Sequence, residues 1–491
     1  MSATAVFAQE RGVTRLDFSL LRRGFLIFGV LNLLIAPSVP DPVAYGVAAF
    51  VPAVLLTIIA RPVMPSGLVF LLIWQWAQVF ARVLQGALDG ESMSGSVYGA
   101  DVPRAFWYAL ASVVTLALAF RVVLGKVPGP TRAEFHAHER WQAPDLIKVY
   151  FAAMAASLVF TFVSRLGGGL DQPMGAAAQV KVVALYLLCT YVFTTGKGAG
   201  TLLAAITFEI MLGFTGLFSD FRVVFFYVAF SAFAARIRWT GAATMASLVW
   251  LAVLVTLALF WTSVKMDYRE YVTGGEETQA ISVPLGERMA YLGDKALQIG
   301  DTKWGETAYM LLTRFAYVDI FGQVIGVAEN SKEPTSVRQW KDALAHIFQP
   351  RFLFPSKAPL SDTDVYLRLA RADPFEQMRM GTSISVGYLA ENYVDLGFPG
   401  MLVGIFILGT LLALVAKYMM SRPGLPWMLK EGIVMGMAYN VAGTGIEISL
   451  PKFLGAMVMF FVVWALIAKF ALPIAIRWLD QRVGFVGPRK T

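Results

Sequence analysis

Cysteine and charge are both scarce in this chain of 491 residues. The only cysteine, Cys189, lies within an apolar run, so the chain can form no internal disulfide framework and no cysteine metal cluster. Charged residues make up only 15% of the sequence, against about a quarter in an ordinary soluble domain, while hydrophobic residues make up 57% and the mean hydropathy is +0.62. These values exclude an ordinary soluble domain and indicate a chain that is solvated largely by lipid.

Apolar runs of roughly 17 to 25 residues, the length needed to cross a bilayer, recur along most of the sequence. They predict an all-α polytopic membrane protein, a bundle of about twelve transmembrane helices with a large helical periplasmic loop. No small-residue cleavage pattern follows the first run, which we interpret as a retained anchor. The predicted spans lie near 24–39, 42–60, 66–86, 105–125, 147–164, 180–196, 199–217, 222–237, 243–264, 396–417, 429–446 and 452–472.

Basic residues gather in the connections on one side of this map. Because lysine and arginine accumulate in cytoplasmic loops, we predict that this side and both termini of a multi-pass membrane protein are cytoplasmic. The net charge of +8 then reflects topology and does not indicate nucleic-acid binding. The basic residues that set this orientation are Arg61, Arg121, Lys126, Arg132, Arg140, Lys148, Lys197, Arg236, Arg238, Lys417, Arg422 and Lys430.

The map divides the chain into three regions. An N-terminal transmembrane bundle of about nine spans covers 1–264, a periplasmic helical loop covers 265–395, and about three further spans with a cytoplasmic tail cover 396–491. A connection so much longer than the usual loop of roughly 4 to 6 residues is expected to be functional. Apolar residues at helical spacing within it predict one helix that carries both Arg314 and Asp319.

Several cations lie where they could meet an anionic lipid headgroup. Arg222 follows a tight outer turn and Arg165 ends a span on the same side, and charges at span ends are costly enough to be functional candidates. The alternative is that they reach the interface or pair with a neighbour such as Asp220. In the loop, Arg351 and Lys357 flank a proline-bounded apolar turn that suits a pyrophosphate, or else they cap a helix end.

Two residues are candidates for a catalytic base. Glu391 is expected near the outer mouth, where a carboxylate can take a proton from a sugar hydroxyl or merely pair with an arginine. His346 is its rival, or else a surface residue, and a single histidine without neighbouring ligands is poor evidence for a metal site. Glu209 lies within a span and is either a functional residue or accepts a bond from a polar residue on another span, such as Gln75 or Gln78.

From about residue 310 to 415, the order of features resembles the O-antigen and exopolysaccharide repeat-unit polymerases of the Wzy type, which are related to the O-antigen ligases. The resemblance covers roughly a quarter of the chain. The ligases often have a histidine just before the span that follows the loop, where this chain has Glu391. The residues that carry the resemblance are Arg314 with Asp319, the Pro350-Arg351 turn ending in Lys357, Thr382-Ser383, and Glu391-Asn392-Tyr393 leading to Gly397 and Gly400.

The resemblance implies a multi-pass glycosyltransferase of the bacterial inner membrane, without a metal or other cofactor. Such an enzyme joins undecaprenyl-pyrophosphate-linked oligosaccharide repeat units at the periplasmic face, with a flippase and a chain-length regulator as further partners. Glu391 would be the base, with His346 in reserve. The residues expected to bind the pyrophosphate or the glycan are Arg222, Arg351, Arg314, Lys357, Arg165 and Tyr393.

Two other functions remain open. An O-antigen-type ligase has the same architecture and differs in the acceptor that it uses. A flippase or transporter of lipid-linked sugars is the main alternative from another class, and it predicts paired broken helices in two halves of the chain. The sequence contains no such symmetry.

Overall fold

The computed structural model describes residues 14–484 except 61–62, 165–168, 217–219, 275–281, 299, 301, 332–335, 350–353, 355–356, 358–360 and 373–383. These residues are almost entirely helical, and an isolated bridge between Arg15 and Arg238 is the one β-type pairing among them. Nine helices of the described part are long and apolar enough to cross a bilayer, or ten if a bent pair counts as one span. The chain is therefore an all-helical, multi-pass membrane protein.

Each predicted span coincides with a helix. The long spans are α2 (Phe18–Ile35), α3 (Pro42–Ile59), α4 (Ser66–Asp89), α5 (Val102–Leu124), α7 (Ala143–Ser164), α8 (Asp171–Ala178) with α9 (Val180–Thr195), α12 (Gly241–Thr273), α19 (Gly387–Met420) and α21 (Leu450–Leu466). Through a π-helical turn, α21 continues into α22 (Leu472–Gly484).

Three further predicted spans correspond to shorter helices. These are α10 (Ala199–Gly213), α11 (Arg222–Ala235) and α20 (Trp427–Ala442), with 15, 14 and 16 residues. Each is shorter than the roughly 20 residues that a helix needs to cross the hydrocarbon core. The count of about twelve spans therefore stays a prediction.

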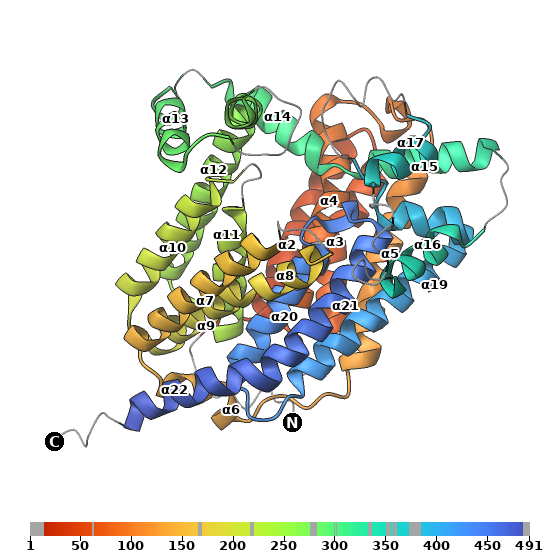
Figure 1. The fold of residues 1–491 in the computed structure, drawn as a ribbon. Coiled ribbons are helices and arrows are strands. Elements are labelled where there is room, and N and C mark those ends of the chain that lie inside the picture. Colours follow the sequence, from red (N-terminus) through yellow and green to blue (C-terminus); the bar gives the residue numbers. More distant parts are fainter. Residues whose placement is uncertain are drawn as a thin grey trace.

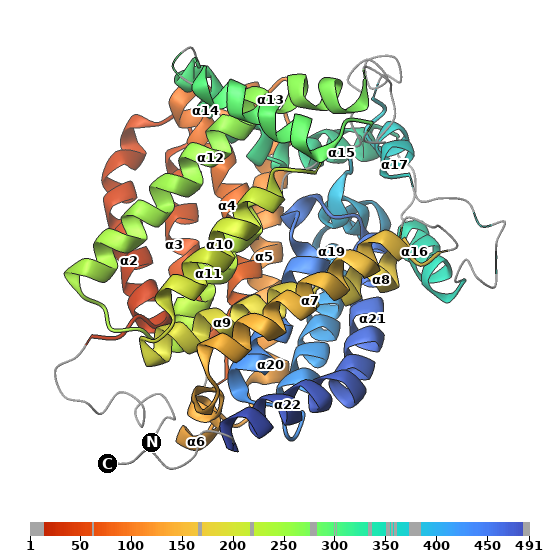
Figure 2. The ribbon, with the colours of Figure 1, turned by 60° about the vertical axis from the view of Figure 1, so that its left-hand side comes forward.

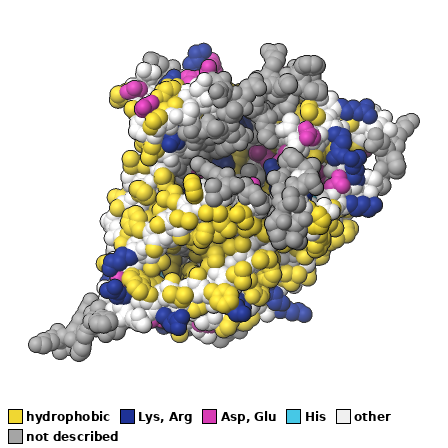
Figure 3. All heavy atoms as spheres, viewed as in Figure 1, with side chains coloured by type: hydrophobic (Ala, Val, Ile, Leu, Met, Phe, Trp, Pro, Cys, Tyr) yellow, Lys and Arg dark blue, Asp and Glu magenta, His cyan; other side chains and the backbone are white. Residues whose placement is uncertain are grey.

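The core of the bundle surrounds α20, which packs against α4, α9 and α21 (Figure 1). Close contact here depends on small residues. A Cβ atom at Gly67 would lie 2.6 Å from the Cα of Met435, so α4 can cross α20 this closely only with glycine at that position. On the flank of the bundle, hydrophobic side chains form a broad surface, and lysine and arginine gather toward its ends (Figure 3). This is the pattern expected of a surface that contacts lipid.

Short helices lie across the two ends of the bundle. At one end are α13 (Leu285–Leu297), α14 (Trp304–Phe315), α15 (Val318–Ser331) and α17 (Asp362–Leu369), and at the other are α6 (Arg132–His136) and α22 (Figures 1 and 2). The helix α16 (Arg338–Phe348) packs beside α19 and α21. We call the end with α13 and α14 the loop end, because its helices come from the long predicted loop.

The single helix predicted to carry Arg314 and Asp319 is broken, and that prediction was wrong. The two helices α14 and α15 meet at a bend of 45°. Phe315 packs edge-on against Trp74, with ring centroids 4.8 Å apart, whereas Asp319 accepts a 2.7 Å hydrogen bond from Nε of Arg82. Since these two anchors lie at different places on α4, the chain bends between them, and Arg314 and Asp319 enter different surroundings.

Candidate functional site

Charged residues from four elements converge at the loop end of the bundle. Arg222 is the first residue of α11, Arg314 lies in the last turn of α14, and Glu447 lies in the short connection between α20 and α21. The Glu447 carboxylate is close enough to both arginines to interact with their charges. Lys265 and Arg269, near the C-terminal end of α12, are close enough to Arg314 for their like charges to repel. We call these five residues the outer charge cluster.

Arg222, Arg314 and Glu447 face one another without closing an ion pair. Among the described residues, no nitrogen of Arg222 or Arg314 lies within 4.0 Å of a Glu447 carboxylate oxygen. Arg222 also lies near the Tyr439 hydroxyl and the Asp220 carboxylate. Both arginine side chains are exposed and Glu447 is half-buried, so a solute can reach all three side chains. An anionic or hydroxylated ligand can therefore enter between the opposite charges.

Gln78 of α4 holds the connection that carries Glu447. Its Nε2 donates to the carbonyl of Thr444 at 3.0 Å and reaches Glu447 Oε1 at 3.5 Å, and its Oε1 accepts the N–H of Ile446 at 2.8 Å. Gly445 has a φ of +75°, and a Cβ atom there would lie 1.8 Å from Gln78 Oε1. Only glycine fits this turn without moving Gln78.

Four other hydrogen bonds fix the residues that follow Glu447. The N–H of Tyr388 donates to the carbonyl of Ile448 at 2.7 Å, and the Glu391 carboxylate accepts the N–H of Leu450. On α17, Asp362 accepts hydrogen bonds from Ser449 Oγ at 2.9 Å and from Lys452 Nζ at 2.6 Å. The connection is thus held from α4, α17 and α19, which gives Glu447 a fixed position.

This environment also changes the acidity of Glu447. Burial raises the pKa of its carboxyl group to about 7, and the positive charges of Arg314 and Arg222 oppose that rise. A carboxylate whose pKa lies near neutrality is suited to accept a proton from a hydroxyl group.

The residues proposed from the sequence do not all lie at the cluster. The structure brings Arg222 and Arg314 together there. Glu391 is only 1% exposed, and its carboxylate holds the backbone of Leu450 beneath the cluster. Tyr393 donates a 3.0 Å hydrogen bond to Glu329, on the side of α19 that faces α5 and α15.

Other predicted residues lie at α16 or outside the described chain. Lys357 Nζ donates to the carbonyls of His346 and Gln349, the latter at 2.8 Å. These bonds place Lys357 at the C-terminal end of α16, one of the two alternatives that its sequence context left open. Arg351 and Arg165 lie outside the described residues, as do Thr382 and Ser383.

The predicted partners of Glu209 were wrong. Glu209 accepts hydrogen bonds from Tyr150 Oη at 2.9 Å and from Lys181 Nζ at 3.0 Å. Gln75 instead accepts a 2.8 Å bond from Tyr388, and Gln78 holds the Glu447 connection. Glu209 thus neutralises Lys181, which the sequence places just inside the span predicted near 180–196, and it bonds to neither glutamine.

Sequence reasoning missed Glu447, Lys265 and Arg269. Glu447 directly follows the span predicted near 429–446, so it is a charge at the outer end of a span, the criterion that selected Arg222. Applied to every span, that criterion would have found it. Lys265 and Arg269 fell within the predicted loop, whereas α12 continues as a helix to Thr273 and carries both toward Arg314.

Comparison of the chain with protein-family models, with curated proteins and with solved structures finds no match. The fold therefore defines a class only, that of an all-helical multi-pass membrane protein. Within the described residues, no group of three or more His, Cys, Asp or Glu side chains could hold a metal ion. The chemistry of the outer charge cluster is the basis on which a function can be argued.

Proposed function

We propose that the protein is a polysaccharide polymerase, a membrane glycosyltransferase that joins undecaprenyl-pyrophosphate-linked oligosaccharide repeat units at the periplasmic face of the bacterial inner membrane. The observation that carries this proposal is the unclosed arrangement of Arg222, Arg314 and Glu447. Cations that face a carboxylate across an accessible space can bind a pyrophosphate and a sugar hydroxyl side by side.

The position of the cluster supports a reaction outside the cytoplasm. Arg132 and Arg140, which belong to the predicted cytoplasmic face, lie in and directly after α6, and α6 is at the opposite end of the bundle from α14 (Figures 1 and 2). By the tendency of basic loops to remain in the cytoplasm, the loop end then faces the periplasm. Lipid-linked repeat units displayed on that side are the substrates that the sequence resemblance implies.

The proposed reaction needs two kinds of group, and the cluster has both. Glu447 takes the proton of the acceptor hydroxyl, whose oxygen forms a bond to the anomeric carbon of the donor sugar. The bond from that carbon to the pyrophosphate breaks, and its electron pair leaves with undecaprenyl pyrophosphate. Arg222 and Arg314 stabilise the negative charge that develops there, with Lys265 and Arg269 as further cations.

Glu447 replaces Glu391 as the base in this proposal. The Glu391 carboxylate is enclosed and accepts the N–H of Leu450, whereas the Glu447 carboxylate borders the space that faces the arginines. A base has to come within hydrogen-bonding reach of its substrate. Glu391 then acts through the backbone that it holds, as a positioning residue.

The test is complementation of cells that lack this protein with wild type, Arg222→Ala or Arg314→Ala, followed by gel analysis of polysaccharide. We expect both variants to lose high-molecular-weight polymer and to accumulate single repeat units. Arg132→Ala is the matched control, because Arg132 is exposed at the opposite end of the molecule.

Two outcomes would point to another function. Full-length polymer that stays on the lipid carrier would identify a ligase. Unchanged polysaccharide in cells without the protein would remove the polymerase proposal and favour a transporter. Full activity in both arginine variants would show that the outer charge cluster is not the site.

A further inference from the structure

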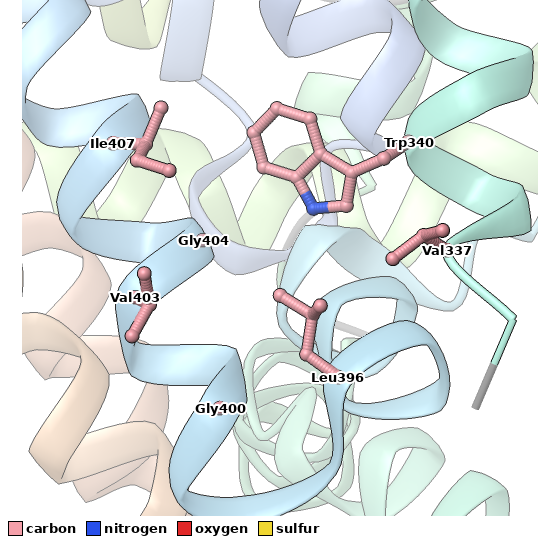
Figure 4. A pocket seen from close by; sticks show the side chains of 7 residues that line it. All are labelled: Val337, Trp340, Leu396, Gly400, Val403, Gly404 and Ile407. Atoms are coloured by element: carbon pink, nitrogen blue, oxygen red, sulfur yellow. The ribbon is translucent and has the colours of Figure 1, made fainter.

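An apolar groove of about 410 Å³ separates the start of α16 from α19. Val337 and Trp340 line it from the side of α16, and Leu396, Val403 and Ile407 line it from α19 (Figure 4). The side chains surround a common space, and the volume falls in the range of roughly 300 to 1,000 Å³ typical of sites for single small ligands.

Glycines on α19 provide the remaining wall of the groove. Gly400 and Gly404 are one helical turn apart and have no side chain to fill it (Figure 4). At Gly404 a Cβ atom would lie 2.0 Å from Oδ1 of Asn392, so this position has to stay open. That same oxygen accepts a 3.0 Å hydrogen bond from Trp340 Nε1, which fixes the indole at the edge of the groove.

The groove lies at the depth of the outer leaflet. The backbone of α19 is non-helical at Gly397 and Phe398, and the part that follows, 399–420, is about 33 Å long, enough to cross the membrane alone. The groove residues of this part lie within about 12 Å of its outer end. Val403 is 62% exposed and Ile407 45% exposed on the flank of the bundle, so a lipid chain can enter from the bilayer.

Two cations lie beside the groove, at the start of α16. Arg338 and Lys341 are exposed on the first turn of α16, next to the groove residues Val337 and Trp340. Arg338 forms an exposed ion pair with Asp342, with 3.7 Å between Nε and Oδ2, and such a long, solvated pair can be exchanged for a contact with a phosphate. An apolar groove next to two cations matches a hydrocarbon chain that ends in an anionic headgroup.

We propose that this groove seats the isoprenoid chain of the acceptor, the second lipid-linked repeat unit of the reaction, with its pyrophosphate on Arg338 and Lys341. The inference rests on the proposed polymerase function. The anomeric carbon of the acceptor is already bonded to its pyrophosphate, so the hydroxyl that reacts belongs to a more distant part of the glycan. The acceptor's lipid anchor therefore has to stand about one repeat unit away from the catalytic cluster.

The arrangement of the helices meets this requirement. Both ribbon views separate α16 from α11, which carries Arg222 (Figures 1 and 2). The two places are nevertheless joined through the first turns of α19. Asn392 bonds to Trp340 at the groove, and its neighbour Glu391 holds Leu450 in the connection that presents Glu447.

The test uses the full-length protein in phosphatidylcholine vesicles and a polyprenyl pyrophosphate with a benzophenone in its chain. After irradiation, labelled peptides are mapped by mass spectrometry. We expect label on peptides from α16 and α19 and a second set near α11 and α14. Val403→Trp should fill the groove from its lipid-facing side and lower the first set about tenfold, while the second set stays unchanged.

A second groove supplies the matched control. It has a volume of about 300 Å³ and lies further along α19, where Leu411 and Tyr418 face Val458 of α21. Val458→Trp fills this groove and should leave both sets of labelled peptides intact. The double variant with Arg338→Gln and Lys341→Gln removes both cations and leaves the first groove empty. It should weaken labelling at that groove, which separates loss of binding from misfolding.

Each outcome decides a different point. Label confined to the peptides near α11 and α14 would overturn the groove proposal and leave the polymerase function standing. Label at α16 and α19 that phosphatidylglycerol displaces as readily as unlabelled undecaprenyl pyrophosphate would show an ordinary phospholipid groove, and would also overturn it. Absence of label at both places would count against the polymerase function itself.

Discussion

Two groups of charges near the loop end of the bundle are built in opposite ways. Arg82 and Asp319 form a closed pair with a 2.7 Å contact, and their side chains are only 6% and 11% exposed. Arg222 and Arg314 of the outer charge cluster are exposed and face Glu447, and no nitrogen of either lies within 4.0 Å of its carboxylate oxygens. The closed pair ties α15 to α4, whereas in the proposed function the charges of the cluster bind a substrate.

This difference is the basis on which we assign a structural role to the closed pair and propose a functional one for the outer charge cluster. Buried ion pairs neutralise each other, and the energy of their contact is used within the fold. Held apart by rigid elements, opposite charges keep their capacity to bind a ligand, and such preorganised groups are the usual source of electrostatic catalysis. The same contrast sets Glu209, closed on Lys181, apart from Glu447.

Breaking the closed pair should have the largest effect on stability. In Arg82→Ala, Asp319 loses its cation in a buried place, which costs about 3–5 kcal/mol when one partner of such a pair is removed. We expect a clear drop in the unfolding temperature in detergent. Arg222→Ala should unfold close to wild type, and an equal drop in both variants would erase the distinction between the two groups.

Removing a cation from the outer charge cluster should have the largest effect on the reaction. Arg314→Ala removes a cation from the leaving pyrophosphate and should lower polymer formation about 100-fold, the size of effect seen when one preorganised electrostatic group is lost. The measurement is polymer synthesis from lipid-linked units, with the unfolding temperature recorded alongside. Arg477→Ala, on the exposed surface of α22, is the control. Unchanged synthesis in Arg314→Ala would contradict the assignment.

The spans could be predicted from sequence because lipid leaves the backbone few choices. A segment in hydrocarbon has to satisfy its own hydrogen bonds, so an apolar run of sufficient length becomes a helix. The break after Arg314 could not be predicted this way. It depends on Arg82, which is 237 residues from Asp319 in the chain, and on the packing of Phe315 against Trp74.

The site was predictable only in part, for a related reason. Charge at a span end marks Arg222 as costly and therefore as a candidate, from local sequence alone. Which carboxylate faces it depends on the turn at Gly445, and that turn is held by Gln78, 368 residues from Ile446. Glu391 has the expected residue type beside the expected span, but its carboxylate is used by the backbone of Leu450.

The pH dependence of the reaction sharpens the comparison further. Because burial raises the pKa of Glu447 to about 7, its ionised fraction falls about tenfold for each pH unit below that value. Polymer synthesis by purified protein should therefore rise with pH up to about 7 and then level off. Glu447→Gln should be slow at every pH. A rise that persists in this variant would show that another group titrates.

The stability of the fold should depend on Glu447 in the opposite sense. Its pKa is raised from an ordinary value of 4.5 to about 7 in the folded protein, so the folded state binds the proton more tightly. Glu447 therefore contributes stability at pH values below 4.5, and this contribution is lost as the pH rises through about 7. Glu447→Gln should accordingly raise the unfolding temperature relative to wild type at pH 8 and leave it nearly unchanged at pH 4.

The smallest expected effect is that of Glu391→Gln, and this variant tests most directly whether Glu391 or Glu447 is the base. Glutamine at position 391 keeps an oxygen that can accept the N–H of Leu450, so Glu391→Gln should retain most activity if Glu391 only holds the backbone. Glu391→Leu leaves that buried donor without a partner, at a cost of about 1–3 kcal/mol, and should lower activity and stability together. If Glu391 were the base, Glu391→Gln would abolish polymer synthesis with no loss of stability, and Glu447→Gln would remain active.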